Sequence, residues 1–163
     1  MSTIVLFLFL SMLIVLWLDS TSYIIPNWLI SLMLVVYPLA VSTAHSVVDW
    51  KMAVLGAVLV LVGGYVIFTK QIMGAGDIKL MTACALWVGF DNLFDFFIAV
   101  TLMGGAFAVG ILGVRKALSY LSNKSERASF VRILRDGEPM PYGIAIAAGF
   151  LLMMETARVP VLL

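Results

Sequence analysis

The chain has 163 residues, of which 63% are hydrophobic and 12% are charged, whereas about 25% of the residues in a typical soluble domain are charged. This composition excludes an ordinary soluble protein, and since a membrane span needs about 20 apolar residues, it allows about six spans in a single membrane domain covering residues 1–163. Ten Lys and Arg residues balance nine Asp and Glu residues, which gives no indication of nucleic acid as a partner, and the single cysteine, Cys84, excludes an intramolecular disulfide or a structural zinc site built from cysteines.

Six apolar segments, separated by ionisable residues and helix breakers, are the predicted transmembrane helices. In chain order they cover residues 3–18, 28–44, 52–68, 78–90, 93–114 and 142 to about 161. The fourth segment is short for a full span, so hydropathy alone leaves a four-helix or five-helix alternative open. The expected fold class is an all-α, polytopic bundle of about six transmembrane helices.

Lys and Arg residues are unevenly distributed between the two sides: eight of the ten lie in the loops that follow the third and fifth helices or, in the case of Lys79, within two residues of such a loop. Cytoplasmic loops of membrane proteins carry the excess of Lys and Arg. We therefore expect the connections 19–27, 69–77 and 115–141 to face the cytoplasm and both termini to lie outside. Residues 115–141 form a basic loop that we expect to set the topology and contact anionic lipid head groups, substrate docking being the alternative.

Two aspartates lie at predicted helix ends on this same side of the membrane. Asp19 ends the first apolar run, and Pro26 helps to turn the chain back, because proline disfavours helix at the residue before it and suits the first turn of a helix. Asp77 follows Gly74 and Gly76 directly before the fourth helix, where glycines allow another segment to approach closely. Taken singly, each aspartate is explained by a helix cap or an interfacial position.

The two aspartates together indicate acid–base chemistry. Two carboxyl groups a few ångströms apart do not both ionise easily, so they share a proton near neutral pH. One then acts as a base toward a water molecule while the other donates a proton to a carbonyl oxygen. This is the chemistry of aspartic proteases, and it requires no cofactor, no metal and no nucleophilic side chain.

Three separated motifs resemble those of the type IV prepilin peptidases. They are Asp19 with Ile25-Pro26-Asn27, then Gly74-Ala75-Gly76-Asp77-Ile78-Lys79-Leu80, then Met140-Pro141-Tyr142-Gly143-Ile144-Ala145-Ile146-Ala147-Ala148-Gly149. The resemblance covers most of the chain, and the chain most resembles the short members associated with tight-adherence (Flp) pili. It implies an aspartic endopeptidase of the bacterial inner membrane that cleaves the basic leader of a prepilin on the cytoplasmic face.

By that resemblance Asp19 and Asp77 are the catalytic residues. Substrate binding or support of the catalytic loops is expected from Pro26, Asn27, Gly74, Gly76 and Lys79. The implied partners are a prepilin inserted in the same membrane and the surrounding lipids. Large members of the family carry a domain with paired cysteines between their first two helices and N-methylate the new terminus, whereas the connection here is the short segment 19–27; we therefore expect no methyltransferase activity. Presenilin-like proteases share the Gly-x-Gly-Asp motif, but their other motifs are missing from this sequence.

Lys79 and the last motif also have structural explanations. Lys79 is expected to extend to the lipid head groups, contact with a carboxylate or with substrate being the alternative. Pro141 suits the start of the last helix, and Gly143 with its small neighbours lets helices pack closely.

Two other function classes remain as alternatives. A small ion-coupled transporter would place its aspartates nearer the bilayer middle and would show a second unwound segment in its other half. A non-catalytic membrane subunit of a pilus or secretion assembly would tolerate loss of either carboxyl group.

Overall fold

The computed structural model describes residues 3–44, 48–121, 142–156 and 159, and these residues form helices and short connections. The helices are α1 (Thr3–Ser22), α2 (Asn27–Thr43), α3 (Trp50–Thr69), α4 (Ala75–Val88), α5 (Leu93–Leu121) and α6 (Tyr142–Glu155). Over the described part of the chain, the expected all-α bundle of about six helices is confirmed.

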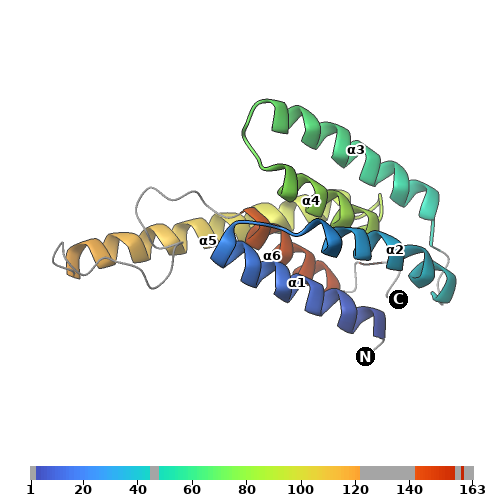
Figure 1. Cartoon of the computed structure of the whole chain (residues 1–163), viewed down its shortest axis with the longest axis horizontal. Coiled ribbons are helices and arrows are strands. Elements are labelled where there is room, and N and C mark those ends of the chain that lie inside the picture. Colours follow the sequence, from blue (N-terminus) through green and yellow to red (C-terminus); the bar gives the residue numbers. More distant parts are fainter. Residues whose placement is uncertain (1–2, 45–47, 122–141, 157–158, 160–163) are drawn as a thin grey trace.

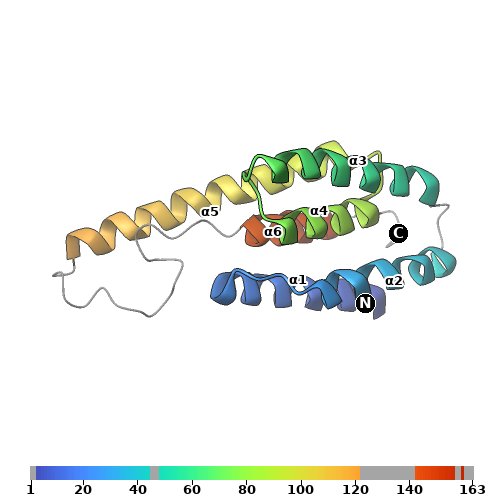
Figure 2. The ribbon, with the colours of Figure 1, turned by 45° about the horizontal axis from the view of Figure 1, so that its top comes forward.

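Successive helices run in opposite directions along the bundle (Figures 1 and 2). The ends of α1 and α3 therefore lie at the same end of the molecule as the starts of α2, α4 and α6, and α5 projects beyond it. We call this the Asp19 end. The starts of α1, α3 and α5 lie at the opposite end.

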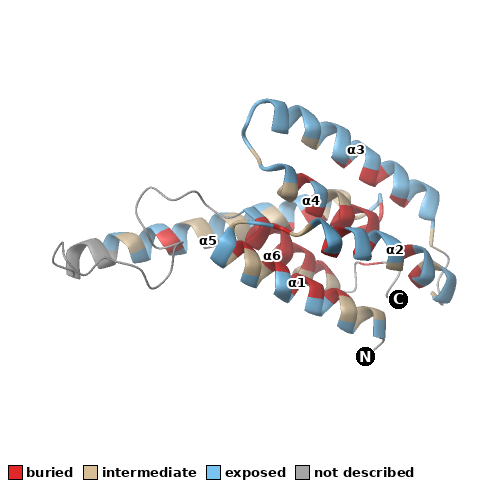
Figure 3. Ribbon diagram, in the orientation of Figure 1, coloured by how far each residue is buried: buried red, intermediate tan, exposed pale blue. Residues whose placement is uncertain are grey.

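The core of the bundle is built on α4 and α6, which are shorter than the helices around them. Helix α6 packs against α1, α4 and α5, and α4 packs also against α2 and α3. Most side chains of α4 and α6 are buried (Figure 3), and Trp87 and Phe150 are among the largest of them. Both helices start at the Asp19 end, so their first turns are held in fixed positions there.

The surrounding helices carry the apolar surface. Helices α1, α3 and α5 are long and apolar enough to cross a membrane, and α2 and α6 are shorter apolar helices. Helix α3 packs on α4 and is exposed over most of its length (Figure 3). Its exposed apolar side chains include Leu59, Val62 and Tyr65. An apolar surface of this extent is unfavourable in water but suits lipid, so these faces are lipid-facing.

Both aspartates lie inside helices, which corrects the expectation that they lie just beyond helix ends. Helix α1 continues past residue 18 to Ser22, where the hydroxyl groups of Ser20 and Thr21 donate to the Trp17 carbonyl oxygen at 2.8 and 2.9 Å. Helix α4 begins at Ala75, before the apolar stretch starts, and ends before Gly89, which has a φ of 78°.

The long basic loop is shorter than expected on its N-terminal side, because α5 continues through residues 115–121. The rest of that predicted loop, residues 122–141, lies outside the described residues. Helix α6 is described as far as Glu155, and its predicted extension to about residue 161 falls largely outside them as well.

Candidate active site

Asp19 lies in the last turn of α1 and is 3% exposed. Its Oδ2 atom accepts a hydrogen bond from the backbone N–H of Ile144 at 3.0 Å, and its carboxyl group also accepts one from the N–H of Gly143. Both donors belong to the first turn of α6, where backbone N–H groups have no acceptor within their own helix. The Asp19 carboxyl group thus caps a helix that lies far away in the sequence.

Gly143 makes this approach possible. A Cβ atom at this position would lie 2.6 Å from Asp19 Oδ2 and 3.0 Å from Ile25 Cδ1. Contacts this short require the carboxyl group to move, so any residue other than glycine would displace it.

Asp77 lies in the first turn of α4 and is partly buried. Its carboxyl group accepts a hydrogen bond from the backbone N–H of Gly74, the residue at the N-cap of the same helix. A side chain at the third helical position often bonds back to the cap residue in this way. A Cβ atom at Gly74 would lie 3.0 Å from Asp77 Oδ2, so the glycine leaves space for the carboxyl group.

The two carboxyl groups are close enough for the charge of Asp19 to act on Asp77. Asp77 precedes the apolar stretch that begins at Ile78 and therefore lies outside the membrane-spanning segments. Burial, and after it the negative charge of Asp19, raise the pKa of Asp77 to about 6, against the lowering effect of the Gly74 hydrogen bond. At neutral pH, Asp77 is therefore ready to take up and release a proton.

The connection between α1 and α2 fills the space between these two segments. Ile25 is 8% exposed, and its side chain faces both Gly76 and Gly143, where added Cβ atoms would lie 3.5 Å from Ile25 Cβ and 3.0 Å from Ile25 Cδ1. Ile25 therefore separates the loop that carries Asp77 from the start of α6, and it fixes their spacing.

Pro26 and Asn27 begin α2 beside the site. Pro26 occupies the N-cap position with extended backbone angles, and Asn27 is the first helical residue. The Lys79 Nζ atom donates to Asn27 Oδ1 at 3.1 Å, which connects α4 to α2. Lys79 therefore bonds to a neighbouring helix in addition to reaching the surface.

The structure gathers all seven predicted site residues at the Asp19 end, Asp19 and Asp77 at the centre and Gly74, Gly76, Pro26, Asn27 and Lys79 around them. Gly143 and Ile144 also belong to the site, and the sequence analysis gave Gly143 only a packing role. The signal for them was the conjunction of Pro141-Tyr142-Gly143 with the other two motifs.

Within the described ranges, no group of three or more His, Cys, Asp or Glu residues could hold a metal ion. What the Asp19 end does contain is a pair of carboxyl groups with backbone donors. It can hold a water molecule, remove a proton from it and return a proton to a nearby oxygen.

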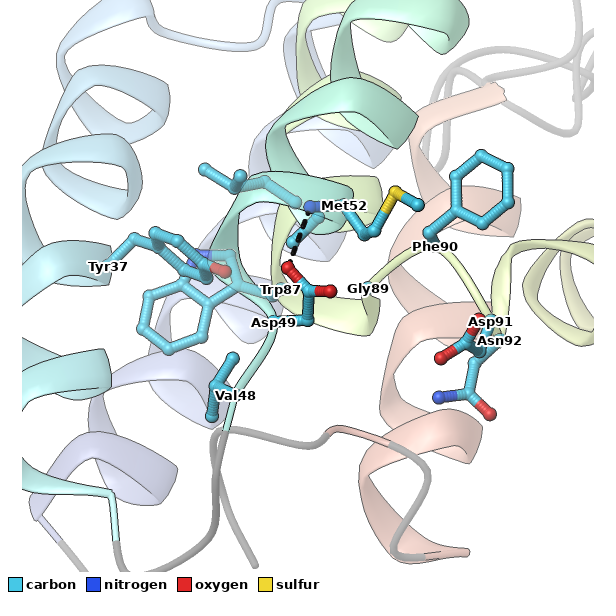
Figure 4. A pocket seen from close by; sticks show the side chains of 11 residues that line it. Tyr37, Val48, Asp49, Met52, Trp87, Gly89, Phe90, Asp91 and Asn92 are labelled. Carbon is cyan, nitrogen blue, oxygen red and sulfur yellow. Dashed lines mark hydrogen bonds between the residues drawn. The ribbon is translucent and has the colours of Figure 1, made fainter.

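Two hollows lie away from the aspartates. A cavity of about 140 Å³ lies at the opposite end between α2, α3 and α4, lined by Tyr37, Asp49, Trp87 and Asp91 among others (Figure 4). There the Tyr37 and Trp87 rings meet edge to face, and the Trp87 indole N–H donates to the Met33 carbonyl oxygen. An open apolar groove of about 520 Å³ lies between α1, α5 and α6.

A sequence model of the type IV leader peptidase family matches residues 6–109. The matched stretch includes both aspartates and the residues of the first two motifs, and it ends before Gly143. No curated protein and no solved structure matches the chain.

Proposed function

The chain belongs to the type IV leader peptidase family, and on that premise we propose that it is an aspartic endopeptidase of the bacterial inner membrane with Asp19 and Asp77 as its catalytic residues. It removes the N-terminal leader of a type IV prepilin, and we propose that this prepilin is of the Flp type. The observation that carries this proposal is that the carboxyl groups of Asp19 in α1 and Asp77 in α4 lie close enough for the charge of one to act on the other; the end of α1 and the start of α4 lie at the same end of the bundle (Figure 1).

The reaction is hydrolysis by an activated water molecule. The ionised carboxylate removes a proton from a water held between the two side chains, and the resulting hydroxide adds to the carbonyl carbon of the scissile peptide bond. The protonated partner gives its proton to the carbonyl oxygen. When the tetrahedral diol collapses, the C–N bond breaks and a proton passes to the leaving amine.

The surroundings of the pair suit an extended peptide. Gly74 and Gly76 have no side chains to obstruct a substrate backbone that comes near Asp77. The prepilin helix that follows the leader shares the membrane with the enzyme, so helix packing in lipid supplies part of the recognition.

Charge supports a cytoplasmic position for the Asp19 end. Four of the described basic residues, Lys70, Lys79, Arg115 and Lys116, lie on the elements that end or begin there, and Lys51 lies at the opposite end. Since Lys and Arg accumulate on the cytoplasmic side, the scissile bond is cleaved in the cytoplasm. Only residues 23–26 separate α1 from α2, so the insertion that carries methyltransferase activity in large members has no place there.

Co-expression with candidate prepilins tests this function, with cleavage read as a mass shift. We expect wild type to remove the leader, and Asp19→Asn and Asp77→Asn to leave it in place while remaining inserted in the membrane. Asp91→Asn is the matched control, because Asp91 is exposed at the opposite end. Wild-type processing by either active-site variant would instead favour the scaffold or transporter alternative.

A further inference from the structure

We infer that the first turn of α6, through Gly143 and the N–H of Ile144, is the element that positions the Asp19 carboxyl group for the reaction and supplies the hydrogen bonds that favour its ionised form. The inference rests on the proposed function and adds two positioning residues to it. Both lie outside the stretch that the family model matches, and neither touches the scissile bond in the proposed mechanism.

The first step of the argument concerns charge. At 3% exposure the Asp19 carboxylate has lost nearly all its contact with water, and a buried charge is costly unless it is hydrogen-bonded. The Ile144 and Gly143 N–H groups replace that hydration. They also lie at the positive end of the α6 dipole, which favours a negative group. The ionised form of Asp19 therefore depends on α6.

The second step concerns space. Glycine in a helix costs about 1 kcal/mol relative to alanine, and Gly143 does not have a positive φ that would require it. What Gly143 provides is room, because a Cβ atom would lie 2.6 Å from Asp19 Oδ2 and 2.9 Å from Asp19 Cγ. The carboxyl group occupies the volume that any other side chain would fill.

The third step compares the two aspartates. Asp77 receives its backbone hydrogen bond from Gly74, within its own helix, and its position follows α4. Asp19 receives its bonds from a helix 125 residues further along the chain. Asp19 therefore depends on α6 for its backbone hydrogen bonds and its position, whereas Asp77 depends only on its own helix.

The test is Gly143→Ala in purified enzyme with a purified prepilin. We expect kcat to fall by about 100-fold or more, since a displacement of about 1 Å in a reacting group has an effect of that size, with KM nearly unchanged. The acidic limb of the pH–rate profile moves to higher pH, because Asp19 loses donors that favour its ionised form.

Two other glycines provide matched controls. At Gly149, on the same helix, a Cβ atom would lie 2.8 Å from the Val100 Cα atom, so Gly149→Ala disturbs packing away from the aspartates. We expect it to lower the melting temperature without moving the pH profile. At Gly105 no atom lies within 4 Å of an added Cβ, so Gly105→Ala should leave cleavage unchanged.

If Gly143→Ala does not insert, replacement of the Ile144 backbone amide by an ester removes the N–H donor without adding bulk, and we expect the same shift of the pH profile. Unchanged kcat and pH profile in these variants, or a loss of kcat that Gly149→Ala reproduces with no shift, would overturn the inference. The same assay includes wild type and Asp77→Asn. Failure of wild type to cleave, or activity of Asp77→Asn, would contradict the proposed function itself.

Discussion

Each carboxyl group of the pair lies at the N terminus of a helix, Asp77 at its own helix α4 and Asp19 at α6. Because α4 and α6 pack together and start at the same end of the bundle, two positive helix ends lie beside the two carboxyl groups. Helix N termini favour negative charge. The negative charge that the reaction needs is therefore stabilised by main-chain groups, with no basic side chain required.

The raised pKa of Asp77 predicts a pH-dependent cost to stability. Folding raises this pKa from 3.8 to about 6, so the native state holds the proton more tightly, and stability falls as pH rises from about 4 to about 6. Asp77→Asn removes that cost. We expect its melting temperature in detergent to exceed that of wild type at pH 7.5, and the difference to shrink below pH 4.

Asp91→Asn serves as the control for this comparison, because Asp91 is exposed and far from the pair. A gap between Asp77→Asn and wild type that is equal at pH 4 and pH 7.5 would show that the effect has another source than the ionisation of Asp77.

Tyr37, at the opposite end of the molecule, also lowers the stability of the folded protein. Its hydroxyl group is buried and has no hydrogen-bond partner among the described residues, and its ring packs edge to face on Trp87 (Figure 4). Tyr37→Phe keeps the ring contact and removes an unsatisfied group, whose burial costs about 1–3 kcal/mol. We expect a higher melting temperature and unchanged cleavage. Tyr37→Leu, which loses the ring contact, should lower the melting temperature, and a destabilised Tyr37→Phe would show that the hydroxyl does have a partner.

For single residues, the sequence identified those whose role follows from their neighbours in the chain. Asp77 with Gly74 and Gly76 forms a contiguous motif, and Asp19 stands out as an acidic residue at the end of an apolar run. The role of Gly143 depends on a carboxyl group more than one hundred residues away, and nothing local reports such a neighbour. A glycine in an apolar helix is equally consistent with packing, which is how the sequence alone explained it.

Among the helices, apolarity located the elements well and their ends less well. The prediction ended the first helix at residue 18 because the following residues are polar, but the hydroxyl groups of Ser20 and Thr21 bond to the preceding turn and α1 continues. Helix α4 begins at Ala75, where Gly74 provides an N-cap position and Asp77 satisfies its N–H. Hydropathy measures contact with lipid, whereas helix ends follow backbone hydrogen bonding.

Helix α3 packs against α4 next to Asp77 and so helps to hold Asp77 in position. A Cβ atom at Gly64 of α3 would lie 2.5 Å from Ile78 Cγ2, directly after Asp77, whereas no atom lies within 4 Å of one at Gly63. We expect Gly64→Ala to destabilise the protein by about 1–3 kcal/mol and to slow cleavage. Gly63→Ala should be neutral or slightly stabilising, because alanine is the better helix former.

Melting temperatures and cleavage rates of the two variants, measured side by side, check this prediction. Ile78→Ala in the Gly64→Ala background should restore part of the loss, since it removes the atom that the new methyl group meets. Equal behaviour of the two alanine variants would mean that α3 does not constrain α4 here.

For the molecule as a whole, the alternating directions of the helices bring the end of α1 and the start of α4 to the same end of the bundle. The sequence predicted this from the distribution of Lys and Arg and from the number of apolar segments. It did not predict that the two shorter helices, α4 and α6, form the centre, because α6 is as apolar as the lipid-facing helices and α4 is less apolar than they are. Burial distinguishes them, and burial depends on neighbours that only the folded chain shows.

Membrane orientation is open to direct measurement. The native cysteine, Cys84, is buried, so it should not react with thiol reagents and introduced cysteines can be labelled without removing it. We expect Ser22→Cys and Lys70→Cys to react with a membrane-impermeant reagent only from the cytoplasmic side, and Asp91→Cys only from outside. Labelling of Ser22→Cys and Lys70→Cys from opposite sides would contradict the shared end of α1 and α3.

The hydrogen bond between Ile144 and Asp19 also has a consequence for the order of assembly in the cell. It joins the first described helix with the last described one, across 125 residues. At about 5–20 residues per second, a ribosome needs roughly 6–25 s to make that stretch. During this interval both aspartates are already in the nascent chain, but Asp19 lacks its donors. The site around Asp19 is therefore completed only after α6 has been made, however early α1 and α4 are inserted.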